Sequence, residues 1–201
     1  MAAGRAAVLL EAEDGEQAAA LHAEVLRRKA AGEVPAGAEV VPAARTVLVD
    51  GLPDPAAFAA MAAGWQVPPL AAGQGDAVEL PVRFDGPDLA EVAALWGMSR
   101  EGVAAVVTGT VFRVAFCGFA PGFGYLTGLP AHLHVPRRAT PRTSVPAGSL
   151  ALAGPYAGVY PRSSPGGWQL LGTAEAALWD PAREPAALLA PGTAVRFTAL
   201  P

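Results

Sequence analysis

Three segments in the second half of the chain combine arginines with glycines and prolines. They read CGFAPGFGYLTGLP at 117–130, VPRRATPRTSVPAGS at 135–149 and YPRSSPGGW at 160–168. Proline fixes φ and glycine permits positive φ, so such segments hold backbone shapes that other residues cannot. Preformed loops with exposed amides can bind oxyanions without any lysine. The segments therefore indicate either an anion-binding site or simply the corners of a β-structure.

The acidic and basic residues are unevenly distributed along the chain. No Asp or Glu occurs between residues 102 and 174, although the net charge of the whole chain is −4. The arginines of this stretch are Arg113, Arg137, Arg138, Arg142 and Arg162. A site for a carboxylate or a phosphate would need such a local excess of positive charge. A solvated basic face or an interface with an acidic partner would produce the same pattern.

The inventory of reactive residues excludes several common sites. Lys29 is the single lysine, so the chain has neither a P-loop lysine nor a plausible Schiff-base lysine. Cys117 is the single cysteine, which excludes a cysteine-based zinc site and an internal disulfide. His132 and His134 are two residues apart but have no carboxylate near them in the sequence, so we expect no metal site. Ser149 lies outside any G-x-S-x-G motif and is a weak candidate nucleophile.

Composition and charge also indicate where the protein works. The negative net charge argues against nonspecific binding to nucleic acid. No apolar run approaches the roughly 20 residues that span a bilayer. Acidic residues follow the short apolar run near the start, where a signal peptide would have its cleavage site, so we expect no signal peptide. With a single cysteine, these features predict a cytoplasmic protein.

The first part of the chain, 1–76, is predicted to be a small α+β domain. Strands are expected at 6–12, 38–43 and 45–51, and helices at 14–32 and 54–64. Asp14 with Gln17 three residues later resembles a capping box. The order strand–helix–strand–strand–helix is typical of a ferredoxin-like sandwich. Residues 71–77 are a plausible linker.

The second part, 77–201, is predicted to be a β-barrel preceded by helices. A strand at 78–84 is followed by an amphipathic helix within 85–97, which Asp85 could cap, and by a short helix that Ser99 could cap. From residue 110 onward, short apolar runs alternate with glycine and proline. Strands are expected at 110–116, 149–154, 167–172 and 194–200, and their number favours a closed barrel.

Long ordered motifs in this sequence resemble a known family. The segments 118–130, 136–154, 158–172 and 188–197, with EVVPAARTVLVDG at 39–51, are similar in order and spacing to the B-type component of the prokaryotic ATP-dependent 5-oxoprolinase. The same family includes the KipI inhibitor of a sporulation histidine kinase and is often labelled allophanate hydrolase subunit 1. The resemblance covers nearly the whole chain.

The resemblance implies an α+β N-terminal domain followed by a cyclophilin-like β-barrel. It implies a partner, the C-type subunit, and often a third subunit of LamB/YcsF type. Together these open 5-oxoproline to glutamate with hydrolysis of ATP, with Mg²⁺ as the usual companion of the nucleotide. Two other functions are open: a KipI-like module that inhibits a sensor kinase, and a carboxyltransferase-like domain acting with urea carboxylase.

The resemblance also assigns residues to a cleft in the barrel. It implies catalytic roles for Arg142, Arg137 and Tyr160. It implies that substrate or nucleotide is bound by Phe119, Pro121, Gly122, Phe123, Pro146, Gly148, Ser149, Ser164, Pro165, Gly166, Gly167 and Trp168. Further cleft positions that match the family are Tyr125, Pro136, Pro141, Val145 and Pro161.

Arg137 and Arg142, with backbone amides, are expected to stabilise charge while a lactam or amide carbonyl is activated by phosphorylation. For Arg142 a structural role is the alternative, in an ion pair with Asp180 or Glu184.

Five positions depart from the family pattern. Thr108 stands where the family usually has His, Phe112 where it has Tyr, and Thr173 where it has Arg, while Tyr156 and Ala157 replace a Gln-Thr pair. If these positions act in catalysis, the protein has altered chemistry, a different substrate or no activity. The barrel also offers few carboxylates for Mg²⁺, with Asp85, Asp88 and Glu91 as the candidates, so we expect the chain to need a partner subunit.

Overall fold

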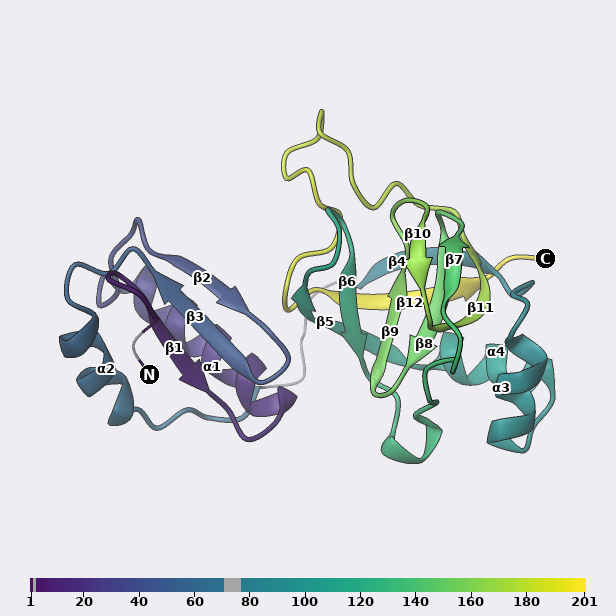
Figure 1. Cartoon of the computed structure of the whole chain (residues 1–201), viewed down its shortest axis with the longest axis horizontal. Coiled ribbons are helices and arrows are strands. Elements are labelled where there is room, and N and C mark those ends of the chain that lie inside the picture. The colour runs from purple at the N-terminus through teal and green to yellow at the C-terminus, as the bar shows by residue number, and fades with distance from the viewer. Residues whose placement is uncertain (2, 71–76) are drawn as a thin grey trace. The chain divides into compact units, whose positions relative to one another are not determined.

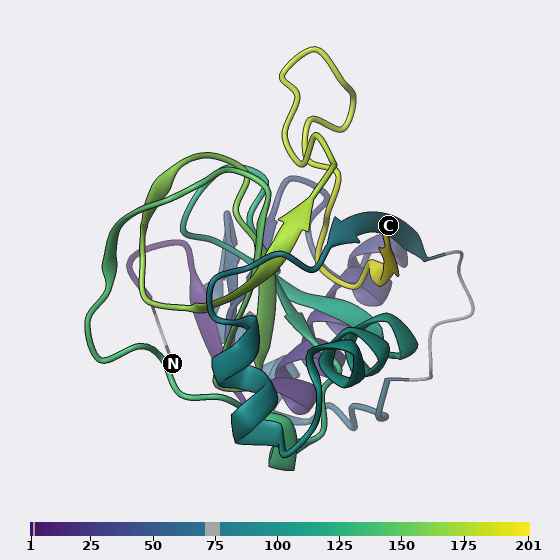
Figure 2. The same cartoon turned by 90° about the vertical axis from the view of Figure 1, so that its right-hand side faces the viewer.

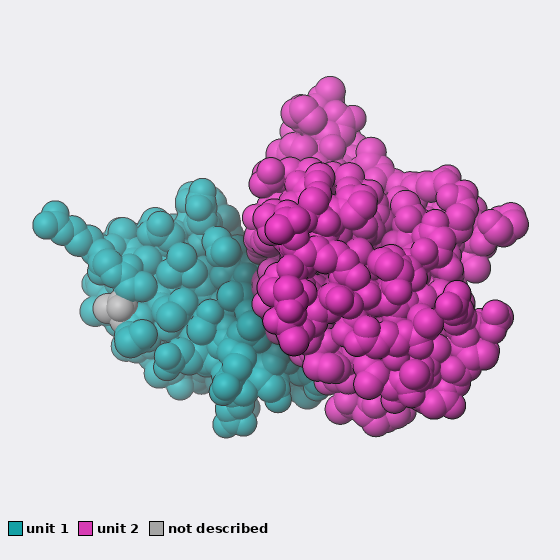
Figure 3. Space-filling view, turned by 45° about the vertical axis from the view of Figure 1, so that its right-hand side comes forward, with its two compact units in different colours: residues 1–74 teal, residues 75–201 magenta. Residues whose placement is uncertain are grey.

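The computed structural model describes residues 1, 3–70 and 77–201. The chain divides into two compact units, residues 1–74 and 75–201, which Figure 3 shows in different colours. The predicted linker at 71–77 and the predicted boundary after residue 76 fall almost entirely on residues outside those described. No helix of the described parts of the chain combines the length and the apolar character needed to span a bilayer.

The first unit is a three-stranded antiparallel sheet with two helices (Figure 1). Its elements are β1 (Val8–Glu11), α1 (Gly15–Ala30), β2 (Glu39–Pro42), β3 (Thr46–Asp50) and α2 (Pro55–Ala63). The strand order β1-β3-β2 is that of the first five elements of the ferredoxin-like motif. The fourth strand of that motif is absent from the residues described.

Local sequence signals explain the helices of this unit. The Asp14 side chain accepts a hydrogen bond from the Gln17 backbone amide at 2.8 Å, and the Gln17 side chain accepts one from the Glu13 amide, so the predicted cap is confirmed. Asp54 caps α2 in the same way through the Ala57 amide. Val25 of α1 is fully buried in a core with Val47 of β3, which holds the helix on the sheet.

The second unit is a closed seven-stranded barrel in the order β11-β4-β12-β5-β6-β9-β8. Its strands are β4 (Val78–Arg83), β5 (Val111–Cys117), β6 (Gly124–Thr127), β8 (Ser149–Ala153), β9 (Tyr156–Val159), β11 (Gln169–Ala174) and β12 (Ala194–Ala199). A separate two-stranded ribbon pairs β7 (Arg142–Val145) with β10 (Ser164–Gly166), and a 3₁₀ turn, η1 (Ala131–Leu133), lies between β6 and β7. The predicted α+β class with a barrel is confirmed.

Two helices, α3 (Leu89–Trp96) and α4 (Arg100–Gly109), lie side by side against β11 and β12 (Figures 1 and 2). The Ser99 side chain caps α4, as predicted, by accepting a hydrogen bond from the Gly102 amide at 3.1 Å. The predicted cap of α3 is wrong: Asp88 occupies the N-cap position, and Asp85 accepts a hydrogen bond from the Thr173 hydroxyl instead. The turn before α3 thus brings one aspartate to the helix end and leaves the other on the surface.

Candidate functional site

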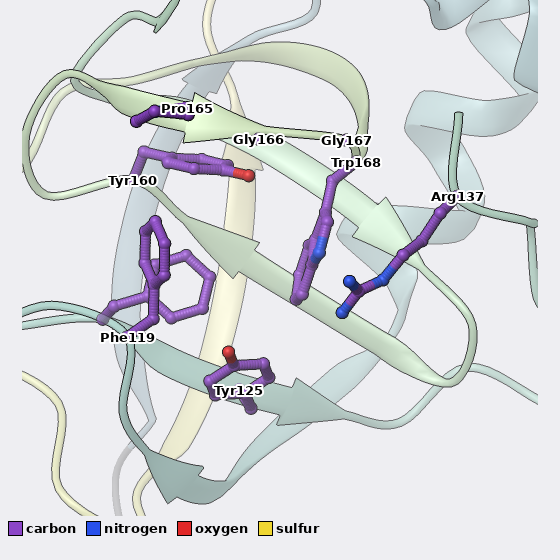
Figure 4. A pocket seen from close by; sticks show the side chains of 9 residues that line it. Phe119, Tyr125, Arg137, Tyr160, Pro165, Gly166, Gly167 and Trp168 are labelled. Atoms are coloured by element: carbon purple, nitrogen blue, oxygen red, sulfur yellow. The ribbon is translucent and has the colours of Figure 1, made fainter. Parts of the chain in front are cut away.

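A pocket of about 210 Å³ lies in the second unit (Figure 4). It is lined by Phe119, Phe123, Tyr125, Arg137, Tyr160, Pro165, Gly166, Gly167 and Trp168. All nine belong to the three glycine- and proline-rich segments identified in the sequence. Those segments, which are separated along the chain, therefore meet at one place.

The alternation of side chains along β8 explains why a pocket forms on the outside of the barrel. All five residues of β8 are buried, because each face of the strand is covered. Leu150 and Leu152 point into the barrel core, whereas Ala151 and Ala153 face a second cluster that contains the pocket aromatics. The small alanine side chains leave room for large rings on the outer face of this wall.

Phe123 organises the aromatic part of the pocket. Its side chain is almost fully buried, and its ring packs edge to face against four others. The ring-centre distances are 5.3 Å to Phe119, 5.0 Å to Tyr125, 5.5 Å to Tyr160 and 5.6 Å to Trp168. Aromatic pairs prefer this geometry, so one buried ring fixes the positions of the four that line the cavity.

The turn before Phe123 places an aromatic ring at the pocket edge in an unusual backbone conformation. Phe119 has a φ of 68° and its side chain is 56% exposed. A bulky residue at positive φ is uncommon and costs about 1–3 kcal/mol, so the surrounding structure must hold it there. Gly122 follows at a φ of 82°, where a Cβ would lie 2.9 Å from the Cβ of Trp179.

Two glycines allow Tyr160 and Phe123 to approach the backbone. A Cβ on Gly158 would lie 2.8 Å from the ring of Phe123. A Cβ on Gly166 would overlap the hydroxyl of Tyr160 and lie 3.0 Å from its Cζ. Gly158 and Gly166 are therefore required by close contacts within the pocket wall.

Arg137 supplies the positive charge of the pocket. It lies between η1 and β7, and its guanidinium group points to the side of the cavity formed by Trp168 (Figure 4). It makes no hydrogen bond or ion pair with any of the residues that the structure describes. An exposed guanidinium beside aromatic rings can bind a carboxylate or a phosphate in bidentate fashion.

Arg142 is not among the residues that line the pocket. Its Nη2 donates to Oδ1 of Asp88 at 2.7 Å, so neither Asp180 nor Glu184 is its partner. Arg138 donates to the same oxygen at 2.8 Å. Sequence reasoning assigned Asp88 only a possible role as a metal ligand. The absence of any acidic residue between 102 and 174 was the signal that these arginines need a carboxylate from elsewhere.

Six more of the predicted binding residues also lie outside the lining: Pro121, Gly122, Pro146, Gly148, Ser149 and Ser164. The Ser149 hydroxyl is buried and donates to the Pro146 carbonyl at 2.8 Å. The Ser164 hydroxyl donates to the Arg162 carbonyl at 3.2 Å. Both hydroxyls thus serve the turns that shape the site.

The positions that depart from the family pattern do not line the pocket either. The Thr108 hydroxyl bonds to the Ala104 carbonyl of its own helix at 2.9 Å, and Phe112 is buried in the barrel core. Thr173 bonds to Asp85 at 3.0 Å. Tyr156 lies behind the lining, edge to face against Tyr125. Ala157 is buried in the barrel core, so none of the five replacements alters the lining of this cavity.

Of the two tyrosines that line the pocket, Tyr160 has a raised pKa. Burial, and to a lesser degree neighbouring Tyr125, raises the pKa of Tyr160, and the positive charges of Arg137 and Arg142 oppose this shift. Tyr160 is thus a hydrogen-bond donor at neutral pH. Among residues 1, 3–70 and 77–201, no three His, Cys, Asp or Glu side chains are grouped so that they could hold a metal ion.

Comparison with curated proteins identifies relatives that match about 60% of this chain. The 5-oxoprolinase B subunit of Escherichia coli O157:H7 is 51% identical over 123 residues, which are 60% of this chain and 56% of that protein. The 5-oxoprolinase B subunit of Haemophilus influenzae is 45% identical over 127 residues, 62% of this chain and 60% of that protein. The chain thus spans a little more than half the length of the curated relatives that it matches.

Solved structures match almost the whole chain. A crystal structure of TTHA0988 has a TM-score of 0.79 and 36% identity, and covers 98% of this chain and 40% of that one. A conserved uncharacterized protein of Pyrococcus horikoshii, PH0987, has a TM-score of 0.60 and 30% identity over 98% of this chain and 95% of its own. Urea amidolyase of K. lactis, at 18% identity and a TM-score of 0.70 over 99% of this chain and 14% of its own, shares the fold.

The sequence model of one family, described as the carboxyltransferase domain, subdomain C and D, matches residues 1–189. This match runs through both units and includes all nine residues of the pocket. Together with the relatives above, it shows that the chain belongs to the carboxyltransferase-domain C and D family, as a relative of the 5-oxoprolinase B subunits.

Proposed function

We propose that this chain is the B-type subunit of an ATP-dependent 5-oxoprolinase, and that its pocket binds the lactam substrate. The observation that carries the proposal is the guanidinium of Arg137, which lies at the edge of an aromatic cavity and has no partner among the residues described. 5-Oxoproline is a small flat ring with a lactam and one carboxylate. Its ring would lie among the aromatic side chains while its carboxylate pairs with Arg137.

The size of the cavity supports a small substrate. Ligand pockets commonly have volumes of about 300–1,000 Å³, and this one is smaller, at about 210 Å³. The residues of the pocket do not fit a whole nucleotide with its metal, because the lining contains one cation and no carboxylate. We therefore assign the binding of ATP and Mg²⁺ to groups outside this pocket, contributed by the C-type partner subunit.

The tyrosines of the pocket suit the chemistry of lactam activation. Negative charge develops on the carbonyl oxygen when a lactam is attacked or activated, and preorganised donors stabilise that charge. Tyr125 and Tyr160 lie on opposite walls of the cavity, and Figure 4 shows the Tyr125 hydroxyl directed toward the space between the rings. Tyr160 stays protonated because burial raises its pKa. Either phenol is placed to donate to the lactam oxygen.

The complete reaction requires the partner subunits. In this proposal the C-type subunit joins the B-type chain, and a LamB/YcsF-type subunit completes ring opening to glutamate. The free Cys117 fits the reducing cytoplasm, where we place the complex. No feature of the described residues favours a kinase inhibitor, and the likeness to the urea enzymes is one of fold.

Calorimetric titration with 5-oxoproline tests the proposal, on the chain alone and on its complex with the C-type subunit. Arg137→Gln should weaken binding about tenfold or more, since a hydrogen bond to a charged group contributes about 1.5–3 kcal/mol. Arg162→Gln is the matched control: it removes a nearby arginine that does not line the pocket and should bind like the wild type. No binding by the wild type in either form, or equal binding by Arg137→Gln, would refute the assignment.

A further inference from the structure

We propose that Asp88 is a positioning residue for this pocket: it ties the segment that carries Arg137 to the strand that follows Trp168. The inference rests on the proposed function in naming the ligand, but the contacts that support it are independent of any ligand. Asp88 itself does not line the pocket.

Both carboxylate oxygens of Asp88 are used. Oδ1 accepts hydrogen bonds from Arg138 at 2.8 Å and from Arg142 at 2.7 Å. Oδ2 accepts one from the backbone amide of Leu170 at 2.7 Å. The residue is 3% exposed, and its side chain makes no capping bond to α3 although it stands at the N-cap position. The carboxylate is therefore committed to the loops and not to the helix.

These bonds join the two sides of the pocket that meet at Arg137. Arg138 and Arg142 lie within the segment 137–142, which extends from the pocket-lining arginine to the start of β7. Leu170 lies two residues beyond Trp168. The amide of Arg138 also donates to the carbonyl of Gly167 at 2.8 Å. One buried carboxylate thus holds the side chains of Arg138 and Arg142 on one side, and the backbone of Leu170 on the other side, of the gap that a ligand would enter.

Asp88 also determines which arginine can receive an anion. The guanidinium of Arg138 lies 2.8 Å from Asp88 and 3.6 Å from Glu91, and that of Arg142 lies 2.7 Å from Asp88. Two carboxylates therefore balance these two arginines, and Arg137 next to them is left without such a partner among the residues described. An anion in the cavity would be attracted to Arg137, because the neighbouring positive charges are already compensated.

A neutral side chain at position 88 would leave two partly buried guanidinium groups without their partner. Buried ion pairs lose most when one member is removed, because the other charge then remains uncompensated. The segment 137–142 should then detach from Leu170 and become mobile, and Arg138 and Arg142 would compete with Arg137 for an anion.

The test compares Asp88→Asn with Glu175→Gln. Glu175 forms an ion pair with Arg83 at 3.1 Å on the exposed surface of the same barrel, so its variant controls for the loss of one carboxylate. Two ligands are titrated by calorimetry: 5-oxoproline and 2-pyrrolidinone, which is the same ring without the carboxylate. Asp88→Asn should lose about tenfold or more of its affinity for 5-oxoproline and keep that for 2-pyrrolidinone. A general loss of packing would weaken both ligands equally.

Limited digestion with trypsin provides a readout that needs no ligand. Cleavage after Arg138 requires local opening of the segment, so its rate reports how firmly the segment is held. Asp88→Asn should be cut there at least about tenfold faster than the wild type under native conditions, and Glu175→Gln at the wild-type rate. If Asp88→Asn does not fold, Arg138→Gln tests the same contact by removing its arginine partner. Digestion of this variant is followed by cleavage after Arg142.

The outcomes separate the two proposals. Unchanged digestion together with unchanged affinity for 5-oxoproline in Asp88→Asn overturns the role of Asp88. Equal weakening for both ligands overturns it as well, since that marks a packing defect. A wild type that binds no 5-oxoproline overturns the proposed function, whereas faster digestion of Asp88→Asn would still support the tie between the two segments.

Discussion

Two adjacent glycines of the pocket should respond in opposite ways to the same substitution. A Cβ on Gly166 would overlap the hydroxyl of Tyr160 and lie 3.0 Å and 3.2 Å from its Cζ and Cε1. Tyr160 is 2% exposed and packs against Phe123, so its ring has little room to retreat. A Cβ on Gly167 would meet Pro141 at 3.5 Å, an ordinary van der Waals distance.

The magnitudes follow from two opposing effects. Replacing glycine by alanine lowers the entropy of the unfolded chain and stabilises a compatible site by about 0.4–1 kcal/mol. Overpacking a closely packed site costs about 1–3 kcal/mol. Gly166→Ala should therefore destabilise the barrel by about 1–2 kcal/mol, whereas Gly167→Ala should be neutral or slightly stabilising. Gly166→Ala should also bind 5-oxoproline more weakly, because the displaced Tyr160 ring enters the cavity.

Urea denaturation followed by tryptophan fluorescence measures the first effect, and calorimetry with 5-oxoproline measures the second. The two variants differ by one position and add the same methyl group, so each controls for the other. If Gly166→Ala is as stable as Gly167→Ala and binds ligand equally well, Tyr160 does not pack against the backbone as described. The shape of the pocket would then not depend on the close approach of Tyr160 to Gly166.

Three further predictions concern ionisation and assembly. Hydrogen bonds from Arg27, and then from Arg28, lower the pKa of Glu24 from 4.5 to about 2. A carboxylate whose pKa is lower in the folded state stabilises the fold above pH 4.5, and this contribution is lost as the pH falls toward 2. When the free energy of unfolding of the first unit is measured by urea denaturation at several pH values, Glu24→Gln should therefore lose less stability below pH 4.5, so that this acid limb of the curve is flatter than that of the wild type. An unchanged acid limb would contradict this pairing. Burial raises the pKa of Tyr160 above its usual value of 10.0, so the stability that the protonated phenol contributes is complete below pH 10 and is lost at higher pH. Above pH 10, Tyr160→Phe should therefore lose less stability than the wild type; an equal loss would contradict the raised pKa. Finally, the isolated chain should release no phosphate from ATP in response to 5-oxoproline, and co-purification with the C-type subunit should restore release; turnover by the chain alone would rule out a composite enzyme.

Elements specified by neighbouring residues could be predicted from the sequence. The caps at Asp14 and Ser99 act over three residues, so each is visible in a short stretch of sequence. All nine residues that line the cavity come from the glycine- and proline-rich segments, since a backbone that must turn sharply or admit a ring leaves its mark in residue type. These segments were therefore recognisable without knowledge of any long-range contact, whereas a binding role for the cavity stays a prediction.

The partners of the arginines could not be predicted in this way. Arg142 was expected to bind a ligand or to pair near the C-terminus, but its partner Asp88 lies 54 residues earlier in the chain. In the sequence Asp88 was considered only as a candidate Mg²⁺ ligand, and its ion pairs with Arg138 and Arg142 depend on how α3 packs against β11. The same limit applies to the β7–β10 ribbon, which no periodicity in its short strands indicated.

The acid-free stretch of sequence is thus a poor guide to the charge of the surface that it forms. Arg113 donates to the Gly192 carbonyl, while Arg138 and Arg142 share the carboxylate of Asp88. Asp88 is far from Arg138 and Arg142 along the chain, and folding brings these opposite charges into contact. In the proposed function, anion recognition depends on the single guanidinium of Arg137, whose neighbouring arginines are neutralised by Asp88, and not on a broad positive potential. For that reason a substitution at Arg137 should weaken carboxylate binding more than a substitution at Arg113 or Arg162, neither of which pairs with Asp88.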